Sequence, residues 1–207
     1  AISMFLTFLG AYALSRKVWM GKRLVTLMIM FTMYFSGGII AIYLWVQQLH
    51  MIDTVWAILL PTALSTYNLI VMRTAFANVP ESLIEAARLD GASEFTCLFR
   101  IVIPLSQATI AVVLLFYAVS RWNDWMSATI FLRTADLYPL QIFLREILLT
   151  SSADNIISTS GGSTNTVALA ETIKYATIVI STAPILCIYP FIQRYFVTGV
   201  MIGGVKE

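Results

Sequence analysis

Charged residues are scarce in this sequence. Asp, Glu, Lys and Arg together make up 12% of the 207 residues, about half the share found in soluble domains. So few charges cannot cover a water-facing surface of this size, which excludes an ordinary soluble enzyme and a disordered segment. Hydrophobic residues make up 59% of the chain, and the mean hydropathy is +0.83. This composition is typical of a protein that crosses a membrane several times.

Metal-ligating and nucleotide-binding residues are scarce too. The sequence has a single histidine, His50, and two distant cysteines, Cys97 and Cys187. These residues cannot supply the three or four nitrogen and sulfur ligands of a zinc site, and they favour no disulfide framework. No G-x-x-x-x-G-K-[ST] run is present, so the chain cannot bind nucleotide phosphates by itself. We therefore expect no catalysis, metal or cofactor in this chain, and the net charge of +2 argues against nucleic-acid binding.

Long charge-free stretches dominate instead. Residues 24–49, 54–72, 101–120 and 175–193 contain no Asp, Glu, Lys or Arg. Each stretch has about the 20 residues that a membrane-spanning helix needs. Residues 1–15 are also charge-free but short, and we expect them to be the end of a spanning helix whose start is missing. The sequence thus predicts an all-α, polytopic membrane helical domain over residues 1–207, with about five crossings, the first one truncated.

Basic residues are unevenly distributed among the connecting segments. Residues 16–23, 73–100 and 194–207 alternate along the chain with residues 50–53 and 129–174. The first group carries nine Lys and Arg residues, and the second carries three. The positive-inside rule therefore predicts that the first group, with its tail at 198–207, is cytoplasmic and that the second is external.

Small and polar residues mark two further places. Ser, Thr, Asn and Gly dominate residues 150–166, which predicts an exposed external loop after a short helix over residues 137–149. Ser36-Gly37-Gly38 interrupts the charge-free stretch 24–49. Glycines at such a place permit either a kink or close helix packing, and we favour close packing.

Residues 78–100 predict a pair of helices between two spans. Pro80 and Glu81 suit a first helical turn, because proline loses no hydrogen bond there and a carboxylate meets the positive end of the helix dipole. Gly91 is placed to end this helix in a left-handed conformation, and Ser93 to cap a second helix. Either the membrane surface or a partner protein must cover the apolar faces of the pair. These faces are Leu83, Ile84 and Ala87 on the first helix, and Phe95, Leu98, Phe99 and Val102 on the second.

The same segment resembles the EAA loop of ABC importer permeases. In that family the EAA triplet is followed by three residues, Gly, nine residues and I-x-L-P. Here Glu85-Ala86-Ala87 precedes Gly91 at this spacing, and the final motif departs only by Ile103 in place of Leu. Three further runs resemble the carbohydrate branch, of the maltose-importer type: Asp90-Gly91-Ala92, Trp122-Asn123-Asp124-Trp125 and residues 190–206.

The resemblance implies a transport subunit in the bacterial cytoplasmic membrane, shortened by one helix and part of a second. The expected partners are a second homologous permease, two ATP-binding subunits that hold ATP and Mg, an extracytoplasmic solute-binding protein, membrane lipid and a carbohydrate substrate. The loop is expected to sit in a groove of the ATP-hydrolysing subunit. The residues that the resemblance assigns to this coupling are Glu85, Ala86, Ala87, Asp90, Gly91, Ile101 and Pro104.

A polar cluster, Arg121-Trp122-Asn123-Asp124-Trp125, follows the third charge-free stretch. Charges at membrane depth normally face a cavity or a partner. The tryptophan rings suit stacking on sugar rings, and Asn123 and Asp124 suit hydrogen bonds to hydroxyl groups, as a carbohydrate path requires. An interfacial Trp belt with a structural Arg121–Asp124 pair explains the cluster equally well. Arg121 lies outside the usual pattern of the carbohydrate branch, and a positive charge there could favour an anionic sugar such as a uronate.

Two other functions stay open at this point. Amino-acid and metal-ion permeases of ABC importers also carry EAA loops, although the Trp/Asn cluster and the C-terminal run argue against them. A channel or structural membrane protein without an ATPase partner would not need Glu85 and Gly91 at this spacing.

Overall fold

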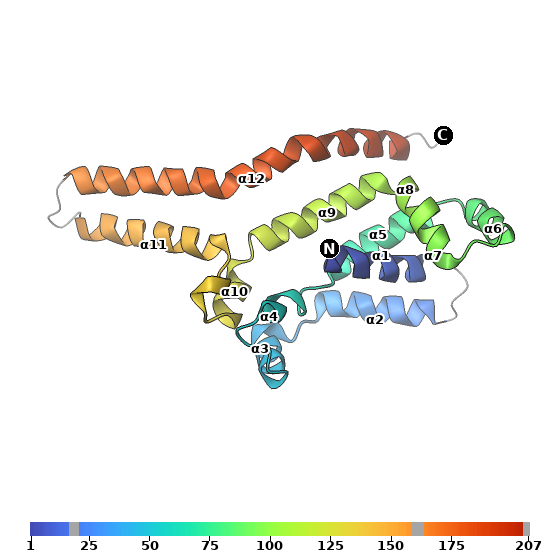
Figure 1. The fold of residues 1–207 in the computed structure, drawn as a ribbon, viewed down its shortest axis with the longest axis horizontal. Coiled ribbons are helices and arrows are strands. Elements are labelled where there is room, and N and C mark those ends of the chain that lie inside the picture. The colour runs from blue at the N-terminus through green and yellow to red at the C-terminus, as the bar shows by residue number, and fades with distance from the viewer. Residues whose placement is uncertain (17–20, 159–163, 205–207) are drawn as a thin grey trace. The chain divides into compact units, whose positions relative to one another are not determined.

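The described part of the chain is helical. The computed structural model describes residues 1–16, 21–158 and 164–204; side chains are described outside 151–170 and, from 191 onward, for Gln193 alone. Within these ranges every regular element is a helix and no strand occurs (Figure 1). The predicted all-α fold is therefore confirmed.

The helices fall into two compact units. The first contains residues 1–42 and 59–118 and the C-terminal end from Ile192, and the second contains residues 43–58 and 119–191. In chain order the elements are α1 (Ile2–Ser15), α2 (Lys22–Tyr34), α3 (Gly38–Gln48), α4 (Val55–Leu59), α5 (Thr66–Ala77), α6 (Glu81–Leu89), α7 (Glu94–Cys97), a π-helical turn (Leu98–Val102), α8 (Ile103–Leu105), α9 (Gln107–Trp122), α10 (Trp125–Phe131), a 3-10 turn (Ala135–Leu137), α11 (Leu140–Ser158) and α12 (Thr164–Gly204).

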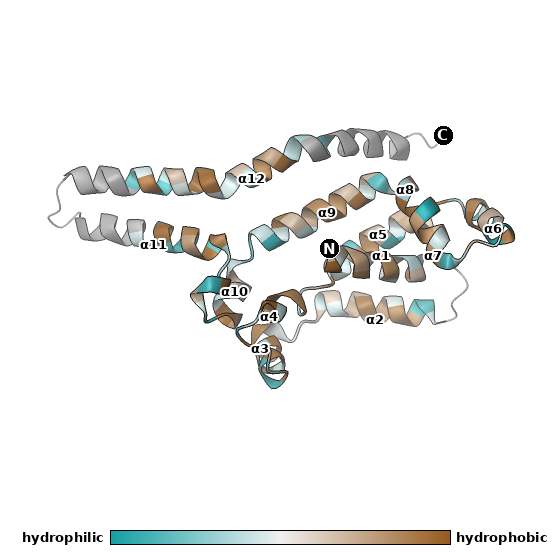
Figure 2. Cartoon of the chain, in the orientation of Figure 1, coloured by the Kyte–Doolittle hydropathy of each residue, from teal (hydrophilic) through white to brown (hydrophobic). Residues whose placement is uncertain are grey.

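The core of the first unit is built around α1 and α5, which pack along each other. Gly10 permits the close approach, because a Cβ atom at this position would lie only 3.0 Å from Leu69 Cδ1. Met72 and Phe76 of α5 and Val113 of α9 are fully buried in the same cluster. In Figure 2 apolar residues dominate the middle of α9 and hydrophilic residues lie at its two ends, which is the pattern of a membrane-spanning helix.

Three of the four charge-free stretches are interrupted, although we expected continuous spans. The helix breaks between α2 and α3, between α4 and α5, and at Ser106 before α9. The stretch 175–193 lies within one helix, α12, even though Pro184 and Pro190 stand inside it. Glycine, proline and capping residues end the other helices locally, even where nearly every neighbouring side chain is apolar.

Each break has its own local cause. Gly38 has φ +74°, and a Cβ atom there would meet nothing within 4 Å, so this glycine serves a left-handed turn. The expectation of close packing was therefore wrong at Gly38. Pro61 lies between α4 and α5, and the Ser65 hydroxyl caps α5 by accepting a 3.4 Å hydrogen bond from the Asn68 backbone N–H. At Ser106 the axis turns by 88° between Glu94–Leu105 and Gln107–Trp122.

Length and hydropathy identify one described helix that can cross a membrane unaided, Glu171–Pro190 within α12. Two bent pairs raise the number to three if each pair forms one broken span: Lys22–Tyr34 with Gly38–Gln48, and Glu94–Leu105 with Gln107–Trp122. Ile2–Ser15 is a shorter apolar helix. The expected number of five crossings stays a prediction.

Contacts within each unit support the predicted alternation of sides. In the first unit the Arg16 guanidinium donates a 3.2 Å hydrogen bond to the Phe76 carbonyl, which joins two segments predicted on one side. In the second unit Asp53 joins the two segments predicted on the other side. Its Oδ1 accepts from the Arg133 and Thr134 backbone N–H groups at 2.8 and 2.9 Å, and its Oδ2 accepts from the Thr134 hydroxyl at 2.6 Å. These hydrogen bonds, led by the one from the hydroxyl, lower the pKa of the Asp53 carboxyl.

The polar regions are more helical than predicted. α11 continues to Ser158 and α12 begins at Thr164, so most of the expected loop at 150–166 is helix; residues 159–163 lie outside the described part. In the same way α12 continues to Gly204, into the expected tail at 198–207. The helix expected at 137–149 is present from Leu140 onward. Ser and Thr oppose helix formation only weakly, so a run of these residues does not by itself end a helix.

Candidate functional site

Helix α6 presents two different faces. Ile84 is 1% exposed and belongs to the core of the first unit, and Ala87 packs against that core half-buried. The opposite face carries Ser82, Glu85, Ala86 and Leu89, spaced at three and four residues and all exposed. The EAA triplet is therefore divided: Glu85 and Ala86 face outward and Ala87 faces the chain's own helices.

Leu89 is a candidate docking residue that the sequence analysis missed. Its side chain is 90% exposed on the same face as Glu85 and Ala86. A leucine this exposed offers apolar area to a molecule that docks on this face of α6. The signal was present in the sequence, since Leu89 follows Glu85 by four residues and Ala86 by three.

The apolar faces of the helix pair are buried differently from our expectation. Ile84, Leu98 and Val102 lie in the chain's own core rather than on the membrane surface or a partner. Leu83 and Phe95 were assigned to the same faces and are 46% and 65% exposed. Phe99 is likewise exposed. The core of the first unit thus fixes the pair in place and leaves a second set of apolar side chains uncovered.

Gly91 makes the turn that the sequence predicted. Its φ is +82°, a left-handed conformation that only glycine adopts at low cost. The Gly91 N–H donates to the Arg88 carbonyl at 3.0 Å, and the Ala92 N–H donates to the Ala87 carbonyl at 2.9 Å. This pair of bonds is the Schellman motif, with Asp90 as the exposed C-cap residue. The turn therefore sets the direction in which the chain leaves α6.

The second helix of the pair, α7, begins after the predicted cap Ser93. It ends earlier than predicted, because a π-helical turn follows it. The Ser93 hydroxyl accepts from the Thr96 backbone N–H at 3.3 Å and caps α7. Half-buried Ile101 lies in the π-helical turn that follows, and exposed Pro104 lies in α8. Proline lacks the N–H that a continuous helix would use, which favours a locally widened helix before it. The long span starts only at Gln107, three residues after the proline.

Glu94 ties the two short helices to α1. Its Oε2 accepts a 2.6 Å hydrogen bond from the Tyr12 hydroxyl, and its Oε1 accepts from Arg88 Nε at 2.8 Å. The Arg16 guanidinium lies 4.8 Å from the centroid of the Tyr12 ring. The hydrogen bond from Tyr12, and then the positive charge and hydrogen bond of Arg88, hold the pKa of Glu94 below its ordinary value. The sequence analysis missed this residue, because its partner Tyr12 is 82 residues away.

Replacing Glu94 with alanine should loosen the helix pair without unfolding the spans. The variant loses both hydrogen bonds. Because Arg88 and Glu94 are partly exposed, the free energy of local opening should fall by about 1 kcal/mol. Amide exchange in α6 and α7 should then be about fivefold faster. Hydrogen–deuterium exchange of the assembled transporter measures this. Because the pKa of Glu94 is lowered on folding, its contribution is present at neutral pH and is lost as the pH falls through the folded-state pKa.

Glu146→Ala is the matched control, because Glu146 is an exposed carboxylate in the second unit. Unchanged exchange in α6 and α7 of the Glu94→Ala variant would show that Glu94 does not hold the pair.

The polar cluster at the end of α9 is not one continuous helical face. α9 ends at Trp122 and α10 begins at Trp125, with Asp124 as its N-cap. Asp124 Oδ1 accepts from the Ser127 backbone N–H at 3.2 Å, and its Oδ2 lies 3.6 Å from an Arg121 guanidinium nitrogen. The Arg121–Asp124 pair considered from the sequence is therefore present. Asn123, in the break, is exposed.

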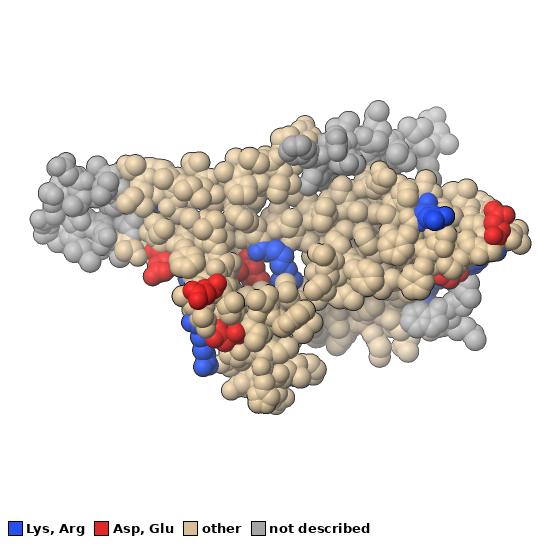
Figure 3. Space-filling view, viewed as in Figure 1, with Lys and Arg blue, Asp and Glu red and all other residues tan. Residues whose placement is uncertain are grey.

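The two tryptophans of the cluster are already engaged. The Trp122 indole N–H donates a 2.9 Å hydrogen bond to the Ser181 carbonyl of α12. The Arg145 guanidinium of α11 lies 3.8 Å from the centroid of the Trp125 ring. One face of Trp125 thus forms a cation–π contact, and Arg145 is exposed beside it. The sequence analysis missed Arg145, whose contact with Trp125 bridges two helices. Figure 3 shows how few charged groups the described surface carries on one face.

A comparison with protein families decides the assignment. The model described as "Binding-protein-dependent transport system inner membrane component" matches residues 6–202. The chain belongs to this family. As a member it is an inner-membrane transport component.

Individual relatives are similar to this chain over nearly its whole length. A polygalacturonan/rhamnogalacturonan transport system permease of Bacillus subtilis (strain 168) is 43% identical over 206 residues, which are 100% of this chain and 72% of that protein. An arabinooligosaccharides transport system permease of the same organism is 25% identical over 99% of this chain and 68% of its own length. The crystal structure of a bacterial ABC transporter involved in the import of the acidic polysaccharide alginate covers 94% of this chain and 69% of the matched chain, with a TM-score of 0.82 and 33% identity.

Proposed function

We propose that this chain is the permease subunit of an ATP-driven importer of acidic oligosaccharides. The observation that carries the proposal is the divided face of α6, which holds Glu85, Ala86 and Leu89 exposed while Ile84 anchors the helix in the core. A helix rigidly fixed on one side and uncovered on the other suits the transfer of movement between subunits. A channel without an ATPase partner has no use for this arrangement.

The partners follow from that role. Two ATP-binding subunits hold ATP and Mg and contact α6, with Glu85 paired to a basic residue of the ATPase. A second homologous permease completes the path, and an external solute-binding protein delivers the substrate. In this orientation α6 and the C-terminal end are cytoplasmic, and Asp53 with residues 133–134 faces outward. The basic residues near α6 and the family of inner-membrane components support it.

The substrate class is supported by two arginines in the second unit. Arg121 is partly exposed and belongs to the polar cluster. Arg145 is exposed and lies against the Trp125 ring of that cluster. Guanidinium groups bind carboxylates through charge-assisted hydrogen bonds, as uronate units would offer. The similarity to permeases of polygalacturonan/rhamnogalacturonan and alginate importers points to the same class, and amino-acid or metal-ion transport has no comparable support.

Arg121→Gln should lower the uptake of uronate oligosaccharides and spare neutral ones of the same length. The loss of one charge-assisted hydrogen bond is worth about 1.5–3 kcal/mol, which is about a tenfold or larger fall in apparent affinity. Uptake into proteoliposomes that contain the whole transporter measures both substrates side by side. Arg145→Gln should show the same selectivity with a smaller effect, since Arg145 is more exposed.

Arg133→Gln is the matched control, because Arg133 is an exposed cation of the same unit outside the cluster. An equal fall for acidic and neutral substrates in Arg121→Gln would mean that Arg121 only balances Asp124, and would contradict the acidic substrate.

A further inference from the structure

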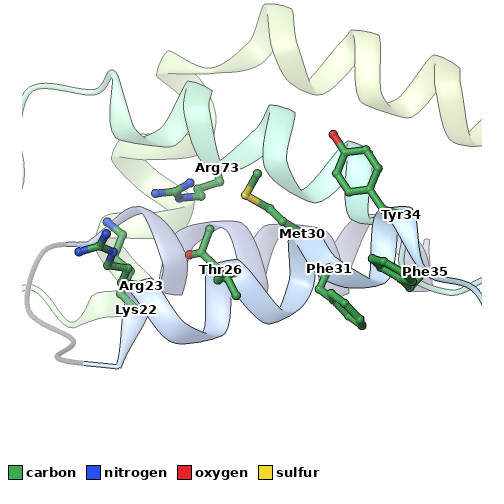
Figure 4. Close-up of a pocket in the computed structure, with 9 residues that line it drawn as sticks. Lys22, Arg23, Thr26, Met30, Phe31, Tyr34, Phe35 and Arg73 are labelled. Carbon is green, nitrogen blue, oxygen red and sulfur yellow. The ribbon is translucent and has the colours of Figure 1, made fainter.

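A groove of about 690 Å³ runs along α2 in the first unit, beside Arg73 of α5 (Figure 4). The two ends of this α2 groove differ in chemistry. Three cations, Lys22, Arg23 and Arg73, lie at one end, and aromatic side chains lie at the other. Its full lining is Lys22, Arg23, Thr26, Leu27, Met30, Phe31, Tyr34, Phe35 and Arg73. The lining therefore contains three positive charges and no carboxylate.

The cations are held at their end by the backbone of α1. Lys22 Nζ donates to the Ser15 and Arg16 carbonyls at 3.2 Å each, and Arg73 Nε donates to the Leu14 carbonyl at 3.2 Å. Carbonyls at the C-terminus of a helix orient positive groups but do not neutralise them. The positive end of the α2 groove is thus a fixed feature of the fold, suited to an anionic group.

The apolar part of the α2 groove has the length of one lipid tail. Its lining residues from Thr26 to Phe35 recur at three and four residues along one side of α2. Nine residue steps in a helix cover about 14 Å, which is close to half the roughly 30 Å hydrocarbon thickness of a bilayer. The helix ends at Tyr34, so the groove runs from the charged end of α2 to the helix break.

Thr26 marks the boundary between the two parts of the groove. It follows Lys22 by one helical turn and lies level with Arg73 in Figure 4, and the lining beyond it is apolar and aromatic.

We propose that the α2 groove binds an anionic phospholipid, with its head group at Lys22, Arg23 and Arg73 and one acyl chain along the lining from Leu27 to Phe35. Basic pockets between membrane helices bind anionic head groups, and an apolar channel of one-leaflet length fits an acyl chain. An oligosaccharide would find few hydrogen-bonding groups beyond the cations.

The test is native mass spectrometry of the purified, delipidated transporter titrated with phosphatidylglycerol and with phosphatidylcholine of the same acyl chains. We expect tighter binding of phosphatidylglycerol to the native protein. Arg23→Gln, at an exposed residue with no hydrogen bond or ion pair to the described residues, should reduce that preference by about fivefold. Met30→Trp, which fills the groove, should remove the site for both lipids. Arg133→Gln, an exposed cation outside the groove, should leave the preference unchanged.

Several results would overturn the proposal. Equal binding of the two lipids, or an unaltered preference in both Arg23→Gln and Met30→Trp, would show that no such site exists. Displacement of phosphatidylglycerol by an acidic oligosaccharide would assign the groove to the substrate path instead. Absence of lipid from native and variant transporters alike would mean that another helix of the assembly fills it.

Discussion

Transport by the Glu85→Lys variant should fall by more than about tenfold, and ATP hydrolysis should no longer respond to substrate. Glu85 is exposed on the face of α6 that we assign to the ATPase contact. Truncating one partner of a hydrogen-bonded charge pair at an interface costs about 2–5 kcal/mol, and a reversed charge adds repulsion. The measurement is substrate-stimulated ATP hydrolysis and uptake by the reconstituted transporter. Glu85→Gln should give uptake and substrate-stimulated ATP hydrolysis between those of Glu85→Lys and the native protein.

The spans should be unaffected, because Glu85 is exposed and Ile84 is the residue of α6 that is buried in the core. Glu146→Lys, the same charge reversal at an exposed site of the second unit, should leave stimulation intact. Undiminished stimulation in Glu85→Lys, in a transporter that assembles normally, would remove Glu85 from the coupling contact.

Gly91→Pro should abolish coupling as completely, for a conformational reason. Proline fixes φ near −65°, whereas Gly91 has φ +82° and donates its N–H to the Arg88 carbonyl. The Schellman turn cannot form, so α6 can no longer keep its direction relative to α7. Gly91→Ala should have a milder effect of about 1–2 kcal/mol, because a Cβ atom meets nothing within 4 Å and only the left-handed conformation is penalised. The ratio of substrate transported to ATP hydrolysed measures both variants.

Gly38→Ala provides a control with the same penalty elsewhere. Gly38 has φ +74° and equally open surroundings, but it lies at the break between α2 and α3. It should lower thermal stability about as much as Gly91→Ala and leave the transport-to-hydrolysis ratio intact. Equal losses of coupling in the two alanine variants would mean that stability, rather than the turn after α6, limits transport.

The helix pair around Gly91 was predictable because its signals are local. Glu81, Gly91 and Ser93 each act on neighbours within one helical turn, and the structure places each in the predicted role. Pro80 was expected in the first turn and precedes it as the N-cap residue of α6. The spacing of the EAA motif also identified the family, which the match over residues 6–202 confirms. The all-α class followed from the charge-free stretches, since each has about the 20 residues that a membrane-spanning helix needs and a helix satisfies its own backbone hydrogen bonds in lipid.

Hydropathy did not predict where the charge-free stretches are interrupted. A window average treats Gly38 and Pro61 as small perturbations of an apolar stretch, although the helix breaks beside each of them and again at Ser106. Likewise, the Ser- and Thr-rich composition of residues 150–158 suggested a loop where α11 continues. Composition indicates which segments are apolar enough to lie in a membrane, while local backbone conformation decides where each helix ends.

The sequence by itself determined the membrane class, the transport family and the turn after α6, because these depend on composition and on residues close together in the chain. Only the tertiary structure decided which side of the EAA helix is free. Ala87 faces the core while Glu85 and Leu89 stay exposed, because Ile84 is buried in the cluster that also contains residues of α1, α5 and α9. It also decided that Glu94 bonds Tyr12 and that Arg145 covers Trp125. These contacts join residues on different helices, and helix packing, which no local pattern encodes, brings them together.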